Sequence, residues 1–180
     1  MPTTIAEPWL SFLAEVDRRL EHAVELHCLG GFVLAVLWGL PRPTGDIDFI
    51  ECRPASASAA VHEIAGEGSE LDRRVRIHVH DVGVAEYPAD YVSRLVDITP
   101  EGSARLRLRA LEVHDVVLAK LGRNGPRDRA DVEFLARRGA IDPRILAERF
   151  EHELRPYVLN EARSTATLEL WIEEFFPRRR

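Results

Sequence analysis

The sequence predicts an α/β protein of the α+β kind, in which a small mixed β-sheet flanked by helices precedes a helical C-terminal subdomain. Two observations support this fold class. Over the first two-thirds of the chain, strand-like and helical segments alternate, whereas the last third has helical spacing only. The chain has 180 residues, enough for one domain with a small helical appendage. We therefore expect a core over residues 1–110 and a helical subdomain over residues 111–180.

The expected core begins with apolar side chains at helical spacing, and Pro8 suits the first turn of that helix. Gly30 and Gly31 end a short strand, and acidic and apolar residues alternate in a later one. The elements expected in this part are a helix at 8–20, a strand at 24–31, a helix at 32–40, a strand at 46–52, a helix at 55–68 and strands at 73–84 and 106–111.

The helical spacing of apolar residues in the last third of the chain predicts four helices. Gly125 and Pro126 separate the first two, because this dipeptide interrupts a helix. Asp142 is placed as an N-cap and Pro143 as the first helical residue of the third. The expected helices cover residues 112–124, 127–139, 142–154 and 162–176.

The composition is that of an ordinary globular protein, with 46% hydrophobic and 30% charged residues. The formal net charge of −6 argues against a protein enclosed in nucleic acid. Cys28 and Cys52 lie in apolar, strand-like segments, so we interpret them as small buried hydrophobic residues in a reducing compartment. The N-terminal segment does not resemble a signal peptide, and no apolar run approaches the ~20 residues of a membrane span. We expect a cytoplasmic protein.

Asp46 and Asp48 are the most informative pair of residues. Side chains two apart on a strand point to the same face, so both carboxylates project together. Two adjacent carboxylates repel each other unless a cation lies between them. Oxygen ligands of this kind suit Mg²⁺, which commonly keeps waters and takes further ligands from substrate phosphates. The pair therefore predicts a Mg²⁺ site, although an isolated pair at this spacing is more often a solvated strand face.

Gly30 and Gly31 lie between a strand and a helix, shortly before the acidic pair. Glycine lets the backbone approach a ligand closely, and N–H groups at a helix N-terminus favour anions. Arg42 and Thr44, in the loop before the acidic strand, offer a positive charge and a hydroxyl to phosphate. A triphosphate could thus bind with its phosphates on the two glycines. A glycine pair alone is most often a turn, and the order of these elements carries the prediction.

The order of a Gly-Gly turn, a helix and the segment RPTGDID resembles the active-site signature of the DNA polymerase beta-like nucleotidyltransferases. The resemblance implies that Gly30 and Gly31 cradle phosphate and that Asp46 and Asp48 bind the catalytic metal. It implies a Mg²⁺-dependent enzyme that transfers a nucleoside monophosphate from an NTP to a hydroxyl acceptor. The two motif regions that carry the likeness cover residues 26–51 and 111–135.

The second region, LEVHDVVLAKLGRNGPRDRADVEFL, resembles small bacterial nucleotidyltransferases linked to abortive infection and type IV toxin–antitoxin systems. In that branch, Lys120 would contact nucleotide phosphate, and Asp128 and Asp131 would belong to a helical motif completing the nucleotide site. Lys120 and Arg123 share a helix face, so Arg123 joins the candidates for nucleotide binding. An interhelical ion-pair network is the alternative for Arg127, Asp128 and Asp131, whereas for Lys120, which lies in an apolar stripe, a functional role is preferred.

The resemblance also implies a third carboxylate on a later strand beside the acidic pair, where it would accept the proton of the attacking hydroxyl or complete the metal site. Asp81 is the nearest candidate and Asp97 a weaker one. Strict alternation places Asp81 on the opposite strand face from His78 and His80, so a local irregularity near Gly83 would have to turn it inward. For the two histidines, a partly packed strand face is preferred over a transition-metal site, because no third ligand is suitably spaced.

The leading hypothesis is an enzyme whose acceptor is an RNA 3′ end, such as that of tRNA, or a protein side chain, and which acts with a cognate toxin or antitoxin partner. The alternative is a catalytically weak or inactive nucleotide-binding regulatory protein, similar to an antitoxin. A third carboxylate beside Asp46 and Asp48 would favour the enzyme over this alternative.

Overall fold

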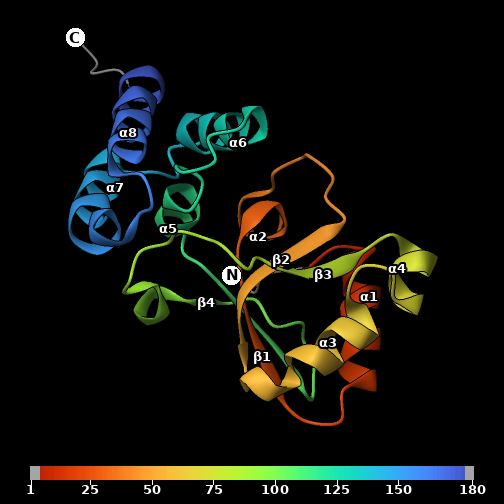
Figure 1. Cartoon of the computed structure of the whole chain (residues 1–180). Helices are drawn as coiled ribbons and strands as arrows, with labels where there is room; N and C mark the ends of the chain where they lie inside the picture. The colour runs from red at the N-terminus through yellow and green to blue at the C-terminus, as the bar shows by residue number, and fades with distance from the viewer. Residues whose placement is uncertain (1–4, 177–180) are drawn as a thin grey trace. The chain divides into compact units, whose positions relative to one another are not determined.

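A computed structural model describes residues 5–176 of the chain, which form two compact units. One unit comprises the residues up to Gly83 together with Leu95–Leu111, and the other comprises Val84–Arg94 and the residues from Glu112 onward. The first unit contains a five-stranded mixed sheet with helices packed on it, and the second is helical (Figure 1). This architecture confirms the predicted fold class.

The sheet has the strand order β3-β2-β1-β5-β4. Its central strand β1 pairs in parallel with β5 and antiparallel with β2, β2 pairs in parallel with β3, and β4 is antiparallel to β5. The register between β1 and β2 shifts opposite Cys28, and Ile50 forms a β-bulge in β2. Before the bulge the odd-numbered residues of β2 are buried, and after it the even-numbered Cys52 is buried. The strands are β1 at Val24–Cys28, β2 at Asp46–Arg53, β3 at His78–Asp81, β4 at Val96–Asp97 and β5 at Leu106–Ala110.

One face of the sheet carries the core of this unit. Leu26, Phe49 and Leu108 are fully buried there, and each such side chain contributes about 1.5–3 kcal/mol to folding through the hydrophobic effect. Helix α1 (Trp9–Arg19) packs against β5 and against helix α3 (Ser58–Ala65), which in turn packs against β3. The other face carries polar side chains, among them Asp48 and His80, which are only partly covered.

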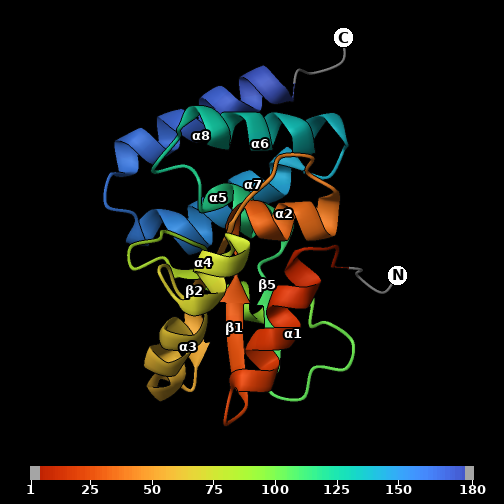
Figure 2. The ribbon, with the colours of Figure 1, turned by 90° about the vertical axis from the view of Figure 1, so that its right-hand side faces the viewer.

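Helix α2 (Gly30–Trp38) follows β1 directly, and Figure 2 shows the strand running into it. It begins two residues before the predicted start because Gly30 adopts a φ of 78°, a left-handed conformation that glycine tolerates. Gly39, with a φ of 66°, ends the helix in the left-handed region. The two predicted glycines therefore form the first turn of α2 rather than the end of a strand.

The prediction of a long strand at 73–84 is wrong for its first half. Residues Glu70–Val75 form helix α4, because the Ser69 side chain caps it by accepting a hydrogen bond from the backbone N–H of Asp72. Arg76, with a φ of 59°, ends α4, and β3 then covers only four residues. A capping serine thus outweighs the strand-like alternation of Arg74, Arg76 and His78.

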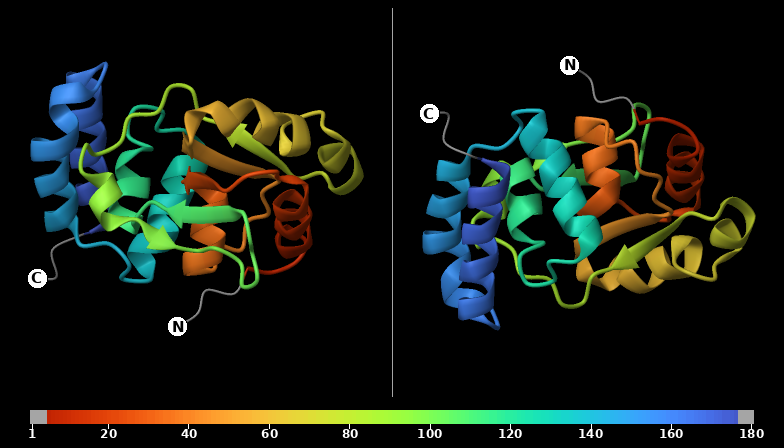
Figure 3. Two further views of the ribbon diagram at one scale, coloured as in Figure 1. Left: turned by 90° about the horizontal axis from the view of Figure 1, so that it is seen from below. Right: turned by 90° about the horizontal axis from the view of Figure 1, so that it is seen from above.

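The second unit consists of helices that pack on one another, with α6 lying along α8 (Figure 3). After α7 the chain continues as a π-helix at Phe150–Leu154 and a 3-10 helix at Arg155–Tyr157. Within residues 5–176, no helix has the length and apolar character that crossing a membrane requires. The helices are α5 at Val113–Leu118, α6 at Pro126–Arg137, α7 at Pro143–Arg149 and α8 at Glu161–Phe175.

Candidate functional site

The backbone of Gly30 lies directly against the carboxylate of Asp48. A Cβ atom added at Gly30 would stand 2.5 Å from Oδ2 of Asp48, closer than Cβ atoms come to other heavy atoms in folded proteins. The backbone N–H of Leu29 also donates to the carbonyl of Asp48, at 3.0 Å. The turn before α2 and the acidic strand β2 are therefore joined at this point, and only glycine fits between them.

Arg42 and Thr44 lie over the second glycine. A Cβ atom added at Gly31 would stand 3.2 Å from Nη2 of Arg42 and 3.6 Å from Cβ of Thr44. Trp9 steadies the loop, because its indole N–H donates to the carbonyl of Thr44 at 3.3 Å. The structure thus brings together the predicted glycines, Arg42, Thr44 and the start of β2.

The N-terminus of α2 lacks a side-chain cap among the described residues, since its N-cap residue is Leu29. The first N–H groups of a helix have no partner within the helix, and together with the helix dipole they favour an anion. Arg42 adds a guanidinium at the same place, which suits phosphate oxygens. The glycine turn has the chemistry of a phosphate site.

The side chains beside Asp46 and Asp48 are histidines. Strand β3 is parallel to β2 and in register with it, so that His78 lies opposite Asp46 and His80 opposite Asp48. The ring nitrogen Nδ1 of His80 is 3.0 Å from Oδ1 of Asp48, and Nε2 of His78 is 3.5 Å from Oδ1 of Asp46. The interpretation of these histidines as a partly packed strand face missed this pairing, which depends on the register between two strands.

Asp81 is not brought to the acidic pair. It lies in register with Phe49, whose side chain is buried on the opposite face from Asp48. The backbone N–H of Val82 still donates to the carbonyl of Phe49, at 2.9 Å, so the pairing with β2 continues past Asp81. The chain turns directly afterwards, where the N–H of Gly83 donates to the carbonyl of Asp81 at 3.1 Å. Asp97 lies on β4, at the far edge of the sheet from β3. The strand register thus places neither residue beside Asp48, and a role of Asp81 or Asp97 as the third carboxylate stays a prediction.

Asp46 and Asp48 supply carboxylate oxygens, the kind of ligand that Mg²⁺ prefers. Their side chains are 58% and 28% exposed, which leaves them accessible to a metal-bearing ligand. Among residues 5–176, no group of three or more His, Cys, Asp or Glu side chains could hold a metal ion. A Mg²⁺ ion that brings its own water and phosphate ligands fits such a pair, whereas an ion held by protein side chains alone does not.

A family model described as "Nucleotidyltransferase of unknown function (DUF6036)" matches residues 11–180 of the chain. The chain belongs to this family. Neither the search of curated proteins nor that of solved structures found a match. The match extends over both compact units, so the helical unit is as much a part of this nucleotidyltransferase as the sheet.

Lys120 of the nucleotidyltransferase is buried in the helical unit, where its side chain is 6% exposed. Its Nζ donates to Oδ1 of Asp128 at 3.1 Å and to Oδ2 of Asp131 at 3.0 Å. Arg123 donates to both oxygens of Asp128, at 2.7 and 2.6 Å. Burial raises the pKa of Asp128, but the hydrogen bond from Arg123 and the charge of Lys120 outweigh it and lower the pKa to about 2.

Lys120 and Arg123 lie in the turn after α5, not in the helix predicted over 112–124, and their contacts with Asp128 and Asp131 form an ion-pair network between this turn and α6. A contact between Lys120 or Arg123 and nucleotide stays a prediction, and the described geometry explains the buried carboxylates without one. A buried lysine needs partners of opposite charge, and Asp128 and Asp131 supply two.

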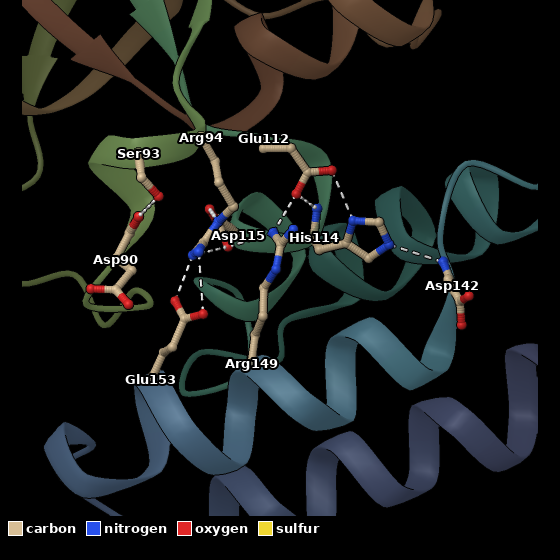
Figure 4. A network of polar contacts seen from close by, with 9 residues as sticks. All are labelled: Asp90, Ser93, Arg94, Glu112, His114, Asp115, Asp142, Arg149 and Glu153. Carbon is tan, nitrogen blue, oxygen red and sulfur yellow. Dashed lines mark hydrogen bonds and ion pairs between the residues drawn. The ribbon is translucent and has the colours of Figure 1, made fainter.

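A second polar network of the nucleotidyltransferase, not predicted from the sequence, joins α5 and α7 to the segment Val84–Arg94 (Figure 4). Arg94 donates to both oxygens of Asp115, at 3.0 and 3.1 Å, and to Glu153. Arg149 binds Asp115 from the other side and also Glu112. Asp115 is fully buried, so this network fixes the fold of the helical unit.

Proposed function

We propose that the protein transfers a nucleoside monophosphate from an NTP to a hydroxyl acceptor and releases pyrophosphate. The observation that carries this proposal is the convergence of Gly30, Gly31 and Arg42 on the strand that bears Asp46 and Asp48. A triphosphate needs a phosphate cradle and a metal-binding pair within reach of each other, and the first unit offers both. The membership in a nucleotidyltransferase family supports the same reaction class.

In this proposal, one group of residues binds the phosphates and another binds the metal. The N–H groups at the start of α2 and the Arg42 guanidinium bind phosphate oxygens, and the Thr44 hydroxyl borders them. Asp46 and Asp48 would hold Mg²⁺, which when bound neutralises phosphate charge and favours in-line displacement at the α-phosphorus. The Gly30–Asp48 contact fixes the cradle relative to the carboxylates.

The acceptor we propose is an RNA 3′ end, such as that of tRNA, or a side-chain hydroxyl of a protein. Arg105 and Arg107 on and beside β5 are exposed and could contact an RNA backbone. Given the resemblance to toxin–antitoxin nucleotidyltransferases, the acceptor or regulator could be a cognate partner. Both acceptor classes can be distinguished in a single labelling experiment.

The test uses the full chain with each α-labelled NTP, Mg²⁺, and either total cellular RNA or cellular protein. We expect label to appear in RNA or in protein with one preferred NTP, and to disappear when both Asp46 and Asp48 are changed to Asn. Losing a metal that supplies several kcal/mol should reduce transfer by at least about 100-fold. Transfer that survives the double substitution would contradict the proposed site.

One observation favours the alternative of a nucleotide-binding protein with weak or no transfer. Asp81 lies in register with Phe49, on the strand face opposite Asp48, and among residues 5–176 the acidic pair belongs to no group of three His, Cys, Asp or Glu side chains that could hold a metal ion. Without a third carboxylate to accept the proton of the acceptor hydroxyl, transfer would be slow even when the triphosphate is bound. Tight Mg²⁺-dependent binding of an NTP with no transfer to any acceptor would establish this alternative.

A further inference from the structure

The two oxygens of the Asp48 carboxylate have different neighbours. Oδ1 is 3.0 Å from Nδ1 of His80, while Oδ2 faces the backbone of Gly30, where an added Cβ atom would stand 2.5 Å away. The carboxylate is therefore fixed at both ends, by a side chain on β3 and by the turn before α2. Neither contact is local in sequence, since His80 lies 32 residues after Asp48.

The contact of His80 follows from the register of the sheet. Asp48 and His80 are directly opposite each other on parallel strands, so their side chains leave the sheet on the same face. Nδ1 is the ring nitrogen nearest the backbone, and it reaches the neighbouring carboxylate without a long extension. His80 thus occupies the position beside Asp48 at which the resemblance led us to expect a third carboxylate.

We propose that His80 is a positioning residue, which donates a hydrogen bond from Nδ1 to Asp48 and orients that carboxylate for the metal of a bound nucleotide. This inference rests on the proposed function of Asp48 as a metal ligand. Carboxylates that bind metals are commonly hydrogen-bonded by an outer partner, whose loss costs about 10–100-fold in metal affinity. A histidine in this place orients the carboxylate without adding a third negative charge to the site.

His78 lies similarly beside Asp46 but is held differently. Its Nε2 is 3.5 Å from Oδ1 of Asp46, at the limit of a hydrogen bond, while its Nδ1 is 3.3 Å from Oδ1 of Asp72. Asp72 in turn accepts a hydrogen bond from the backbone N–H of Gly68, at 2.8 Å. His78 is thus bound into the α4 region, and the positioning role falls to His80.

The experiment measures metal and nucleotide binding rather than transfer. The full chain is titrated with Mn²⁺ in the presence of the α,β-methylene analogue of each NTP, and free Mn²⁺ is followed by electron paramagnetic resonance. The side chain of His80 is 55% exposed, so its hydrogen bond is weakened by solvent. We therefore expect His80→Ala to weaken Mn²⁺ binding by about tenfold, the low end of the range for such partners.

His80→Asn tests the positioning role directly, because the side-chain amide nitrogen of Asn can take the place of Nδ1. We expect it to restore the Mn²⁺ affinity to within about threefold of the wild type. The matched control is His22→Ala, a change at an exposed histidine in the turn before β1, which should leave the affinity unchanged. Circular dichroism checks that each variant is folded.

The outcomes separate this inference from the proposed function. If the wild type binds Mn²⁺ with an analogue, Asp48→Asn abolishes binding and His80→Ala does not change it, the positioning role is wrong and the site stands. The same holds if His80→Asn is as weak as His80→Ala. If Asp48→Asn binds as tightly as the wild type, or the wild type binds no analogue, the proposed site and the positioning role fall together.

Discussion

Gly30 and Asp48 are in such close contact that neither can be changed without affecting the other. The carboxylate oxygen Oδ2 occupies the space in which any side chain at position 30 would begin, and Gly30 has a φ of 78°. The phosphate cradle and the metal-binding pair of the proposed site are thereby joined in one rigid arrangement.

This contact predicts the effect of Gly30→Ala. The left-handed backbone costs an alanine about 1 kcal/mol, and displacement of the Asp48 carboxylate should weaken Mg²⁺-dependent nucleotide binding by at least about tenfold. The control is Gly68→Ala, because Gly68 has a φ of 76° but nothing within 4 Å of an added Cβ atom. Both variants should lose stability in urea unfolding, Gly30→Ala at least as much as Gly68→Ala because its Cβ also displaces Asp48, and only Gly30→Ala should lose affinity. Equal affinities in calorimetric titrations would contradict this expectation.

The register of β3 predicts that Asp81→Asn has little effect on the site. Asp81 is exposed and lies on the opposite strand face from Asp48, so we expect nucleotide binding and any transfer to stay within about twofold of the wild type. Asp46→Asn, measured in parallel with labelled NTP, should reduce both by at least about 100-fold. A comparable loss in both variants would show that Asp81 reaches the metal after all.

Burial of Lys120 between two carboxylates predicts a large loss of stability for Lys120→Met. Removing the ammonium takes away the buried cation that Asp128 and Asp131 share, which should cost about 3–5 kcal/mol in the free energy of unfolding. Arg123→Met is the comparison: its side chain is 74% exposed, and Asp128 keeps Lys120 and the N–H of Gly125, so we expect a smaller loss. Urea unfolding measures both. A stable Lys120→Met protein with weakened nucleotide binding would instead support a phosphate contact.

The pKa of Asp128 predicts how stability depends on acid. Folding lowers this pKa from 3.8 to about 2. The contribution of the ionised Asp128 to stability is therefore complete above about pH 4 and is lost as the pH falls towards 2. The shift corresponds to about 2 kcal/mol. Glu112 acts in the same direction, because hydrogen bonds from His114 and Arg149 outweigh its burial and lower its pKa to about 2. The free energy of unfolding, measured between about pH 4 and pH 2, should decrease less steeply with falling pH in Asp128→Asn than in the wild type.

Much of the proposed site could be predicted from the sequence. The spacing of Asp46 and Asp48 determines that both carboxylates leave a strand on one face, since strand periodicity is a local property. Gly30 and Gly31 predict a close approach of the backbone and the start of a helix. The segment RPTG predicts the loop between that helix and the acidic strand. Short-range geometry is sufficient for each of these features.

Only the tertiary structure decided which residues lie beside the acidic pair and the glycine turn. His80 rather than Asp81 faces Asp48, because the register between β2 and β3 is set by core packing of Phe49 and Val79 and by the helix that Ser69 begins. Lys120 binds Asp128 and Asp131 because burial of its charge requires nearby carboxylates. Such pairings join residues far apart in the chain, and a one-residue change in register would exchange every neighbour across the strands.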